Sequence, residues 1–465
     1  MPASDLVRNL ILVYAISLAA IVFLARLRVP PVVAMVAAGI LAGPAGFGLV
    51  AQEQVDALAE LGVIFLLFTV GLDFSLAELR RTLGRMVLAG LLQIAATALA
   101  VGAMGLALGL ALPTAIFAGL FVALSSTAIV LKTLADRNAL ASPAARLATG
   151  VLLFQDLAVV VLLLLLPVLA GRTAGGGTVD LLVRGGLALG LVAAVARLVL
   201  PRLLRFVLGS GRREAFPLAI LVASVGTAWA SAQLGVPMAI GAFLGGLVIA
   251  ESEFCHQAHA EVRPLRDVLS ALFFVSLGLL VEARFVVTHV GTVVGLTILV
   301  VAVKAVTATV ALLPLAPVRI AATAGLYLAQ VGEFSFILGR AALALGIVGE
   351  PVWQALLAAS IGSMLLAAPI VAAAPALTAR LARERRRGAA RPAKMPASGH
   401  VLVLGFGVGG RLVATTLREL GIEYVVLELN GRTVRAARRE GEPILYGDAT
   451  SPESLRRAGL EQARA

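Results

Sequence analysis

Long apolar runs follow one another along the first 380 or so residues, and they limit the possible folds more than any other feature. Each run is long enough to cross the ~30 Å hydrocarbon core of a bilayer as a helix. Hydrophobic residues make up 60% of the 465-residue chain and charged residues only 14%, which excludes a water-soluble globular protein. The sequence therefore predicts an all-α polytopic membrane protein.

We predict about thirteen transmembrane helices from the lengths of these runs. The predicted spans cover approximately 5–26, 31–49, 55–73, 85–110, 114–134, 145–170, 180–208, 214–232, 237–253, 267–282, 289–313, 317–345 and 352–380. Lys and Arg gather in the loops after odd-numbered spans, so we expect the N-terminus outside and the C-terminus in the cytoplasm. The net charge of +12 then reflects membrane topology and not binding to nucleic acid.

The sequence indicates three regions of different character. We expect residues 1–382 to form the membrane domain, with a separate interfacial helix at 74–85. Residues 383–399 are rich in Arg, Pro, Ala and Gly and read as a basic linker beside anionic headgroups. Residues 400–465 alternate short apolar strands with helical patterns, which predicts a partial α/β Rossmann-like domain.

One predicted span, 145–170, contains adjacent polar residues, Gln155 and Asp156, in apolar surroundings. A carboxylate at this depth costs at least ~2.5 kcal/mol on insertion scales, so it is seldom without a role. One reading is a protonated packing carboxyl group or one paired with a basic side chain. The other, which we prefer, is a site that binds a cation and a proton in a transport pathway.

Two further spans carry signals of an interrupted helix. Ser125, Ser126 and Thr127 are consecutive hydroxyl residues in span 114–134, and such a run offers the backbone alternative partners. Glu333 follows Gly332 in span 317–345. The two spans are seven apart in order, which predicts two inverted repeats whose broken helices cross near the midplane, where transporters place their ion sites.

Lys304 lies in the middle of span 289–313, too far from either end to extend its charge into water. We expect its partner to be Asp156 or Glu333, the available carboxylates. Together with the hydroxyl residues, these groups offer the hard oxygen ligands that alkali cations prefer. A carboxylate that binds either a cation or a proton produces exchange by competition.

Four motifs occur in order: LSSTA, FQDLAVV, QVGEFSFIL and a GxGxxG sequence. With them the chain resembles the bacterial Kef-type potassium/proton antiporters of the second monovalent cation:proton antiporter family, whose regulatory domain is an RCK N-terminal (TrkA-N) domain. The resemblance implies a homodimer in the bacterial inner membrane that works by an elevator-like movement. It also implies that Asp156 binds the cation and proton beside Gln155. Related sodium/proton exchangers have an acid where this chain has Gln155, which favours potassium.

Other functions remain open. One alternative is a sodium/proton antiporter, and another is a nucleotide-gated potassium channel or sensor. A channel would need a carbonyl filter such as TVGYG, and this sequence does not contain one. An enzyme is not expected, because no catalytic second domain accompanies the glycine motif.

The glycines of the soluble segment, Gly405, Gly407 and Gly410, lie between an apolar strand and a helix, the context of a dinucleotide-binding turn. Glu428 closes the next strand, where it would hold a ribose hydroxyl, and Asp448 follows the third strand. The resemblance implies NAD(H), AMP or another adenine nucleotide as a regulator. The segment contains only three strands, about half of a doubly wound fold.

The loop around 256–266 bears on two further possible ligands. It is less acidic than the corresponding loop of glutathione-gated Kef proteins, so we expect glutathione control to be doubtful. Cys255, His256 and His259 supply no fourth ligand, so no metal site is expected.

Overall fold

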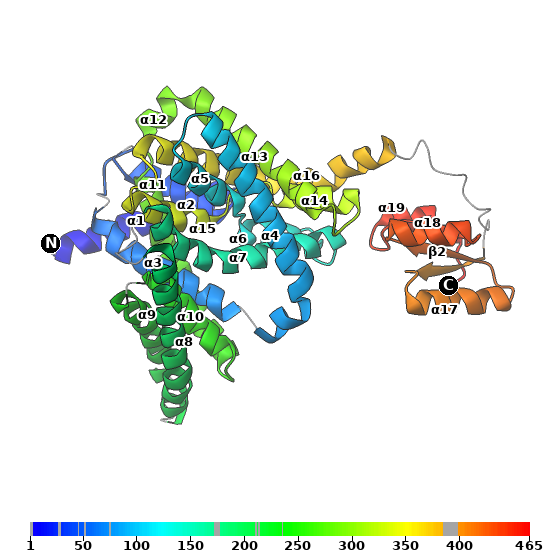
Figure 1. The fold of residues 1–465 in the computed structure, drawn as a ribbon, viewed down its shortest axis with the longest axis horizontal. Coiled ribbons are helices and arrows are strands. Elements are labelled where there is room, and N and C mark those ends of the chain that lie inside the picture. Colours follow the sequence, from blue (N-terminus) through cyan, green and yellow to red (C-terminus); the bar gives the residue numbers. More distant parts are fainter. Residues whose placement is uncertain are drawn as a thin grey trace. The chain divides into compact units, whose positions relative to one another are not determined.

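A computed structural model describes residues 3–26, 29–44, 46–50, 53–73, 76–171, 177–209, 212, 214–234, 236–384 and 399–465 (Figure 1). The chain divides into two compact units. The first comprises Met1–Leu315 and Ala321–Ala374, and the second comprises Ala316–Ile320 and Pro375–Ala465. The proposed borders at 382 and 399 stay a prediction.

The first part of the chain is helical, as its apolar runs predict. The helices are α1 (Ala3–Ala25), α2 (Pro31–Ala42), α3 (Glu53–Asp73), α4 (Leu76–Ala107), α5 (Leu112–Ala123), α6 (Thr127–Ala135), α7 (Pro143–Leu169), α8 (Gly177–Gly209), α9 (Ala215–Gln233), α10 (Met238–Ala250), α11 (Cys255–Leu279), α12 (Ala283–Thr288), α13 (Val290–Leu312), α14 (Val318–Tyr327), α15 (Glu333–Ala344) and α16 (Glu350–Glu384).

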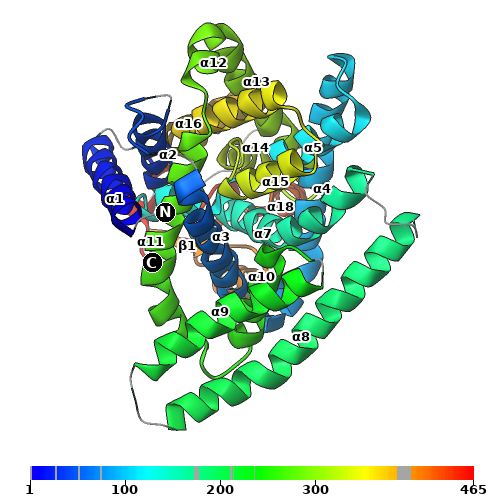
Figure 2. The ribbon, with the colours of Figure 1, turned by 90° about the vertical axis from the view of Figure 1, so that its left-hand side faces the viewer.

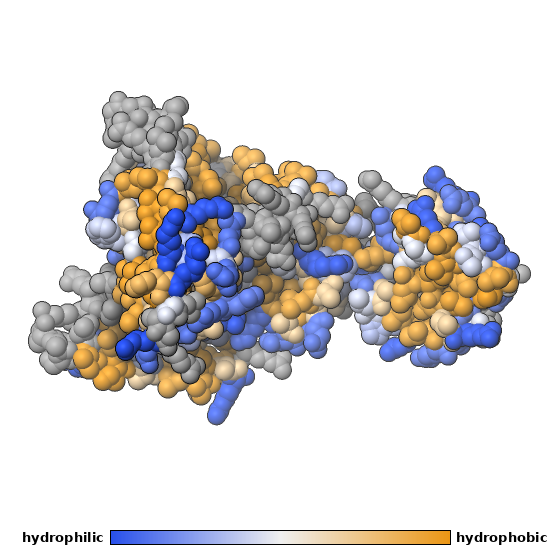
Figure 3. Space-filling view, turned by 90° about the horizontal axis from the view of Figure 1, so that it is seen from below, coloured by the Kyte–Doolittle hydropathy of each residue, from blue (hydrophilic) through white to orange (hydrophobic). Residues whose placement is uncertain are grey.

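Seven helical segments of the described residues are long and apolar enough to cross a membrane, α5 and α6 being taken as one segment. They confirm a polytopic helical protein, whereas the total of thirteen spans stays a prediction. Figure 3 shows apolar side chains over much of the face that it presents. Exposed large apolar residues such as Leu18, Leu99 and Val306 are those that a lipid-facing surface requires.

Two boundaries differ from the sequence-based expectation. The separate interfacial helix at 74–85 was wrong, because α4 is one continuous helix from Leu76 to Ala107. Gly84 does not interrupt it, since a helical glycine costs only about 1 kcal/mol. Likewise α11 begins at Cys255, so residues 256–266 are helical and not a loop. Pro264 lies inside α11 and is tolerated there.

The helices of the first unit form groups (Figure 2). In one, α3 packs against α10 and α11, and α11 also packs against α2. In another, α4 packs against α5, α7 and α13, and α15 packs against α5 and α7. Small residues allow close approach within a group: a side chain at Gly39 of α2 would collide with the backbone of Val275 in α11.

Two helices are interrupted where the sequence predicted. The break between α5 and α6 spans residues 124–126, and the break between α14 and α15 spans residues 328–332. This confirms the two broken helices. Their relation by an inverted repeat stays a prediction.

The C-terminal segment forms a parallel three-stranded sheet in the order β1 (Val401–Leu404), β2 (Tyr424–Glu428) and β3 (Ile444–Tyr446). Helices α17 (Val408–Glu419) and α18 (Gly431–Arg439) follow β1 and β2, and α19 (Pro452–Arg457) and a 3-10 turn (Leu460–Gln462) follow β3. The predicted alternation of strands and helices is therefore confirmed, with boundaries within a few residues.

Candidate functional site

The two helix interruptions contact each other inside the first unit. The Gly332 backbone N–H donates to the Leu124 carbonyl at 3.0 Å, and the Ser126 N–H donates to the Gln330 side chain at 2.8 Å. A Cβ at Gly332 would lie 2.6 Å from the Ser125 backbone. Glycine is therefore required at this crossing, because any side chain would push the two interruptions apart.

Lys304 stabilises the end of the first interrupted helix. Its ammonium group donates to the Val122 carbonyl at 2.5 Å and to the Leu124 carbonyl at 2.7 Å, and the residue is fully buried. A cation at a helix C-terminus is favoured by the helix dipole and satisfies carbonyls that lack partners within the helix. The expectation that Asp156 or Glu333 pairs with Lys304 was wrong, because the packing of α13 against the end of α5 brings Lys304 to these carbonyls.

Gln155 is committed to the same interruption. Its side-chain oxygen accepts from the Ser125 N–H at 2.8 Å, and its amide nitrogen donates to Gln93 at 2.5 Å and to the Ala123 carbonyl at 3.2 Å. Gln93 on α4 also donates to Ala123 and to Thr97. Gln155 therefore holds the α5–α6 break in place, and its predicted role as an ion ligand stays a prediction.

Asp156 lies on α7, next to the first residue of α6, Thr127, and is 6% exposed. Both of its carboxylate oxygens accept from the Thr127 hydroxyl, at 3.1 and 3.0 Å. Ser126 is the N-cap of α6, so the carboxylate is near the positive end of that half-helix.

Glu333 is the first residue of α15 and is 6% exposed. Its Oε2 atom is buried and has no hydrogen-bond partner within the described part of the chain. The Glu333 and Asp156 carboxyl groups interact electrostatically, and Ser126 interacts with Glu333. The Asp156 and Glu333 carboxyl groups and the Thr127 hydroxyl thus form a cluster of oxygen atoms where the interruptions meet, here called the acidic cluster. Such a cluster is suited to a proton or a hard cation.

The structure brings together most of the transport residues that the sequence suggested. Thr127, Asp156 and Glu333 form the cluster, whereas Ser125, Ser126, Gln155 and Lys304 hold its two half-helices through backbone groups. Sequence reasoning missed Gln93. Its signal was a carboxamide inside the apolar span 85–110, the same kind of signal that identified Gln155, and the structure shows that Gln93 is fully buried.

The glycine turn of the second unit has the predicted form. Gly405 has φ +95°, a left-handed conformation that favours glycine, and a side chain at Gly410 would collide with the Gly405 carbonyl. Gly407 is the N-cap of α17. The Glu428 carboxylate accepts from the Phe406 N–H at 2.5 Å, which places it beside this turn.

Asp448 follows β3 at the same edge of the sheet, since parallel strands end together. Its carboxylate accepts from the backbone and hydroxyl of Thr450 at 2.8 and 2.7 Å. Glycine turn, Glu428 and Asp448 therefore form one edge at which the phosphates and ribose of a nucleotide would find donors and acceptors. Their role in binding stays a prediction.

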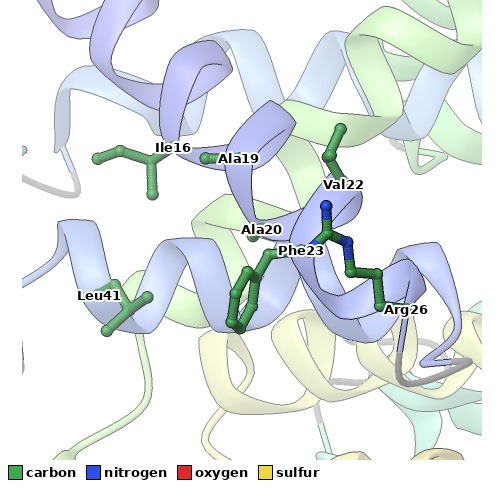
Figure 4. Close-up of a pocket in the computed structure, with 7 residues that line it drawn as sticks. All are labelled: Ile16, Ala19, Ala20, Val22, Phe23, Arg26 and Leu41. Carbon is green, nitrogen blue, oxygen red and sulfur yellow. The ribbon is translucent and has the colours of Figure 1, made fainter.

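Cys255 and His259 both approach the Leu72 carbonyl, at 3.9 and 3.3 Å. Among the described residues, no group of three His, Cys, Asp or Glu side chains is arranged to hold a metal ion. An apolar cavity of about 490 Å³ lies on α1 and α2, where Figure 4 shows Phe23 between Leu41 and Arg26 in this view. None of its lining residues belongs to the acidic cluster.

Several known proteins are similar to this chain in sequence or in fold. Residues 12–375 match the model of the transmembrane sodium/hydrogen exchanger family, and residues 401–465 match the TrkA-N domain. The K(+) efflux antiporter 1, chloroplastic, of Arabidopsis thaliana is 34% identical over 93% of this chain and 38% of its own length. The glutathione-regulated potassium-efflux system protein KefC of Cronobacter sakazakii is 33% identical over 97% of this chain and 73% of its own length.

The chain thus spans less than half of the length of the chloroplastic relative. Among solved structures, the sodium proton antiporter MjNhaP1 from Methanocaldococcus jannaschii at pH 8 has a TM-score of 0.61 and 15% identity. That match covers 82% of this chain and 99% of the other, and it shows a shared fold. Because the name of the KefC relative includes glutathione regulation, the expectation that glutathione control is doubtful is not supported.

Proposed function

The chain belongs to the sodium/hydrogen exchanger family, and from this premise we propose that it exchanges a monovalent cation for protons across a membrane. The observation that supports this most strongly is the Asp156 carboxylate, held by Thr127 where two interrupted helices meet. Binding of a cation or a proton to this one group is mutually exclusive. Alternating exposure of the site to the two sides then carries each ion across in opposite directions.

The surrounding residues supply the electrostatics of this exchange. The N-terminal ends of α6 and α15 direct partial positive charge towards Asp156 and Glu333. Lys304 places its positive charge at the C-terminal end of α5 and bonds to the Val122 and Leu124 carbonyls. These carbonyls therefore do not compete for the cation. The proton and cation states therefore differ mainly at the two acids.

Potassium is the proposed cation. The two relatives described above are named for potassium efflux, and this chain has the neutral Gln155 next to Asp156. Sodium is the alternative, and the fold shared with the sodium proton antiporter MjNhaP1 keeps it open. One cation exchanged for one proton follows if Asp156 alone changes its ligand.

The TrkA-N segment is proposed to regulate transport by binding NAD(H), AMP or another adenine nucleotide at Gly405, Gly407, Gly410, Glu428 and Asp448. Glutathione is a second proposed effector, by similarity to the KefC relative. We further propose a homodimer in a bacterial inner membrane, with the N-terminus outside and the TrkA-N segment in the cytoplasm.

The test is the dissipation of a pH gradient in proteoliposomes after potassium or sodium is added. We expect a potassium-dependent proton flux that Asp156→Asn abolishes, because Asn keeps the volume and accepts from Thr127 but cannot carry the proton. Asp136→Asn is the matched control, since Asp136 is an exposed residue at the end of α6. Undiminished flux in Asp156→Asn would reject Asp156 as the exchanging group.

A further inference from the structure

A second charged residue, Arg340, lies on α15 beyond the acidic cluster. It follows Glu333 by seven residues, which places it about 10 Å further along the helix axis at ~1.5 Å per residue. Its side chain is half-buried between helices. A charged group inside a span is costly, so its position calls for a function.

Arg340 connects two helices that belong to different packing groups. Its Nη1 donates to the Ser276 hydroxyl of α11 at 3.2 Å, and Ser276 is fully buried. α15 packs with α5 and α7, whereas α11 packs with α2 and α3. The contact therefore joins the packing group that carries Asp156 and Glu333 to the packing group of α2, α3 and α11, which carries neither residue.

A second contact reaches the end of α11 from α16, whose Trp353 ring lies 6.2 Å from the Phe121 ring of α5. The Gln354 amide on α16 donates to the Leu280 carbonyl at 2.8 Å, and its oxygen accepts from the Glu282 N–H at 3.1 Å. In the proposed topology, the ends of α11 and α15 both face outside. This side of the acidic cluster is thus the one at which the two groups are joined.

We propose that Arg340 is the outer gate of the cation pathway. Its contact with Ser276 holds α15 against α11 and closes the outer side, and it separates when the site opens outwards. Its positive charge also opposes the return of a released cation to Asp156 and Glu333. This inference rests on the proposed exchange of a cation, which it extends by assigning the outer barrier and a direction-dependent affinity.

The electrostatic part has a limited expected size. A unit charge about 10 Å from the cation lowers outer cation affinity about 2-fold at the dielectric constant of water and about 15-fold at an effective value near 20. Arg340→Ala should therefore lower the apparent KM for outer potassium by a factor in this range. The apparent KM for inner potassium should change less, because the inner route does not pass Arg340.

The gate itself is tested without any transport assay. Ile337 lies on α15 between Glu333 and Arg340, is 6% exposed, and belongs to the same buried cluster as Phe273 and Leu277 of α11. Ile337→Cys in a Cys255→Ser background provides one thiol. Its reaction with a membrane-impermeant anionic methanethiosulfonate, added outside, reports separation of α15 from α11.

We expect Arg340→Ala, and more weakly Ser276→Ala, to accelerate this labelling at least 3-fold. Loss of a positive charge by itself would slow an anionic reagent, so a faster reaction identifies opening. Arg340→Lys retains the charge and should restore the outer KM. Arg284→Ala, at an exposed arginine of α12, is the matched control and should leave labelling unchanged.

Equal labelling rates in the parent, Arg340→Ala and Ser276→Ala would overturn the gate. Faster labelling without potassium-dependent flux in any variant would retain the gate and reject the proposed exchange, so the two failures are distinguishable. The labelling rate of each variant in detergent is compared with its rate after full unfolding. A slower rate in detergent verifies that the variant is folded.

Discussion

Three buried polar residues in this protein satisfy backbone groups at the end of one interrupted helix. Lys304, Gln93 and Gln155 bond to the three carbonyls at the end of α5, those of Val122, Ala123 and Leu124. An unsatisfied buried carbonyl costs about 1–3 kcal/mol, so the break is stable only because these side chains reach it. Asp156 and Glu333 are the residues that we propose for ion binding.

At the residue scale, Lys304→Ala should lower the free energy of unfolding by about 2–5 kcal/mol, because two buried carbonyls lose their donor. Thermal unfolding in detergent measures this loss. Lys132→Ala, at an exposed lysine of α6, should be neutral within about 0.5 kcal/mol. Equal stability of the two variants would mean that the α5 carbonyls find other partners.

Gln155→Glu tests the bracing role of the carboxamide. The change keeps the shape but replaces a donor to Gln93 and Ala123 with an acceptor, so we expect a loss of about 1–3 kcal/mol in stability. Gln93→Ala should then cost less in the Gln155→Glu background than in the parent protein. Additive effects of the two substitutions, measured by a double-mutant cycle in thermal unfolding, would show that the pair is not coupled.

At the element scale, the proposed function depends on two half-helices that meet at Gly332. The sequence signalled both interruptions, through three consecutive hydroxyl residues and through Gly332 next to Glu333. It did not signal that α4 is continuous or that α11 starts at Cys255, since charged residues at a helix end and in a loop look alike. Hydrogen bonding along the backbone decides between them.

Gly332→Ala should reduce exchange at least 10-fold, because the new Cβ would lie 2.6 Å from the Ser125 backbone, which cannot rotate away. Ion flux in proteoliposomes at matched protein content is the measurement. Gly349→Ala is the control, since the nearest atom to a Cβ there is 4.0 Å away. If both variants transport equally, the crossing of the interruptions does not limit activity.

At the scale of the whole molecule, a membrane unit with an acidic cluster is joined in sequence to a TrkA-N segment with a glycine turn. The two sites share no residues, so their functions are separable by mutation. Coupling between them would require that nucleotide binding favour one state of the membrane unit over the other.

Glu428→Ala should weaken nucleotide binding at least 10-fold in the full chain, because the carboxylate at the end of β2 is the proposed ribose ligand. Titration with NADH or AMP in detergent provides the measurement. Glu419→Ala, at an exposed acid of α17, should bind like the parent, and potassium flux without nucleotide should be unchanged in both. Unaltered affinity in Glu428→Ala would place the ribose elsewhere.

The sequence by itself determined the membrane character, the two helix interruptions, the central Asp156 and the strand–helix order of the C-terminal segment. These follow from hydropathy and backbone preference, which act between residues close in the chain. Only the tertiary structure decided that Lys304 bonds to α5, that Gln93 supports Gln155, and that Arg340 contacts Ser276. A buried polar group must bond to whatever helix packing brings within about 3 Å, and sequence spacing does not specify that neighbour.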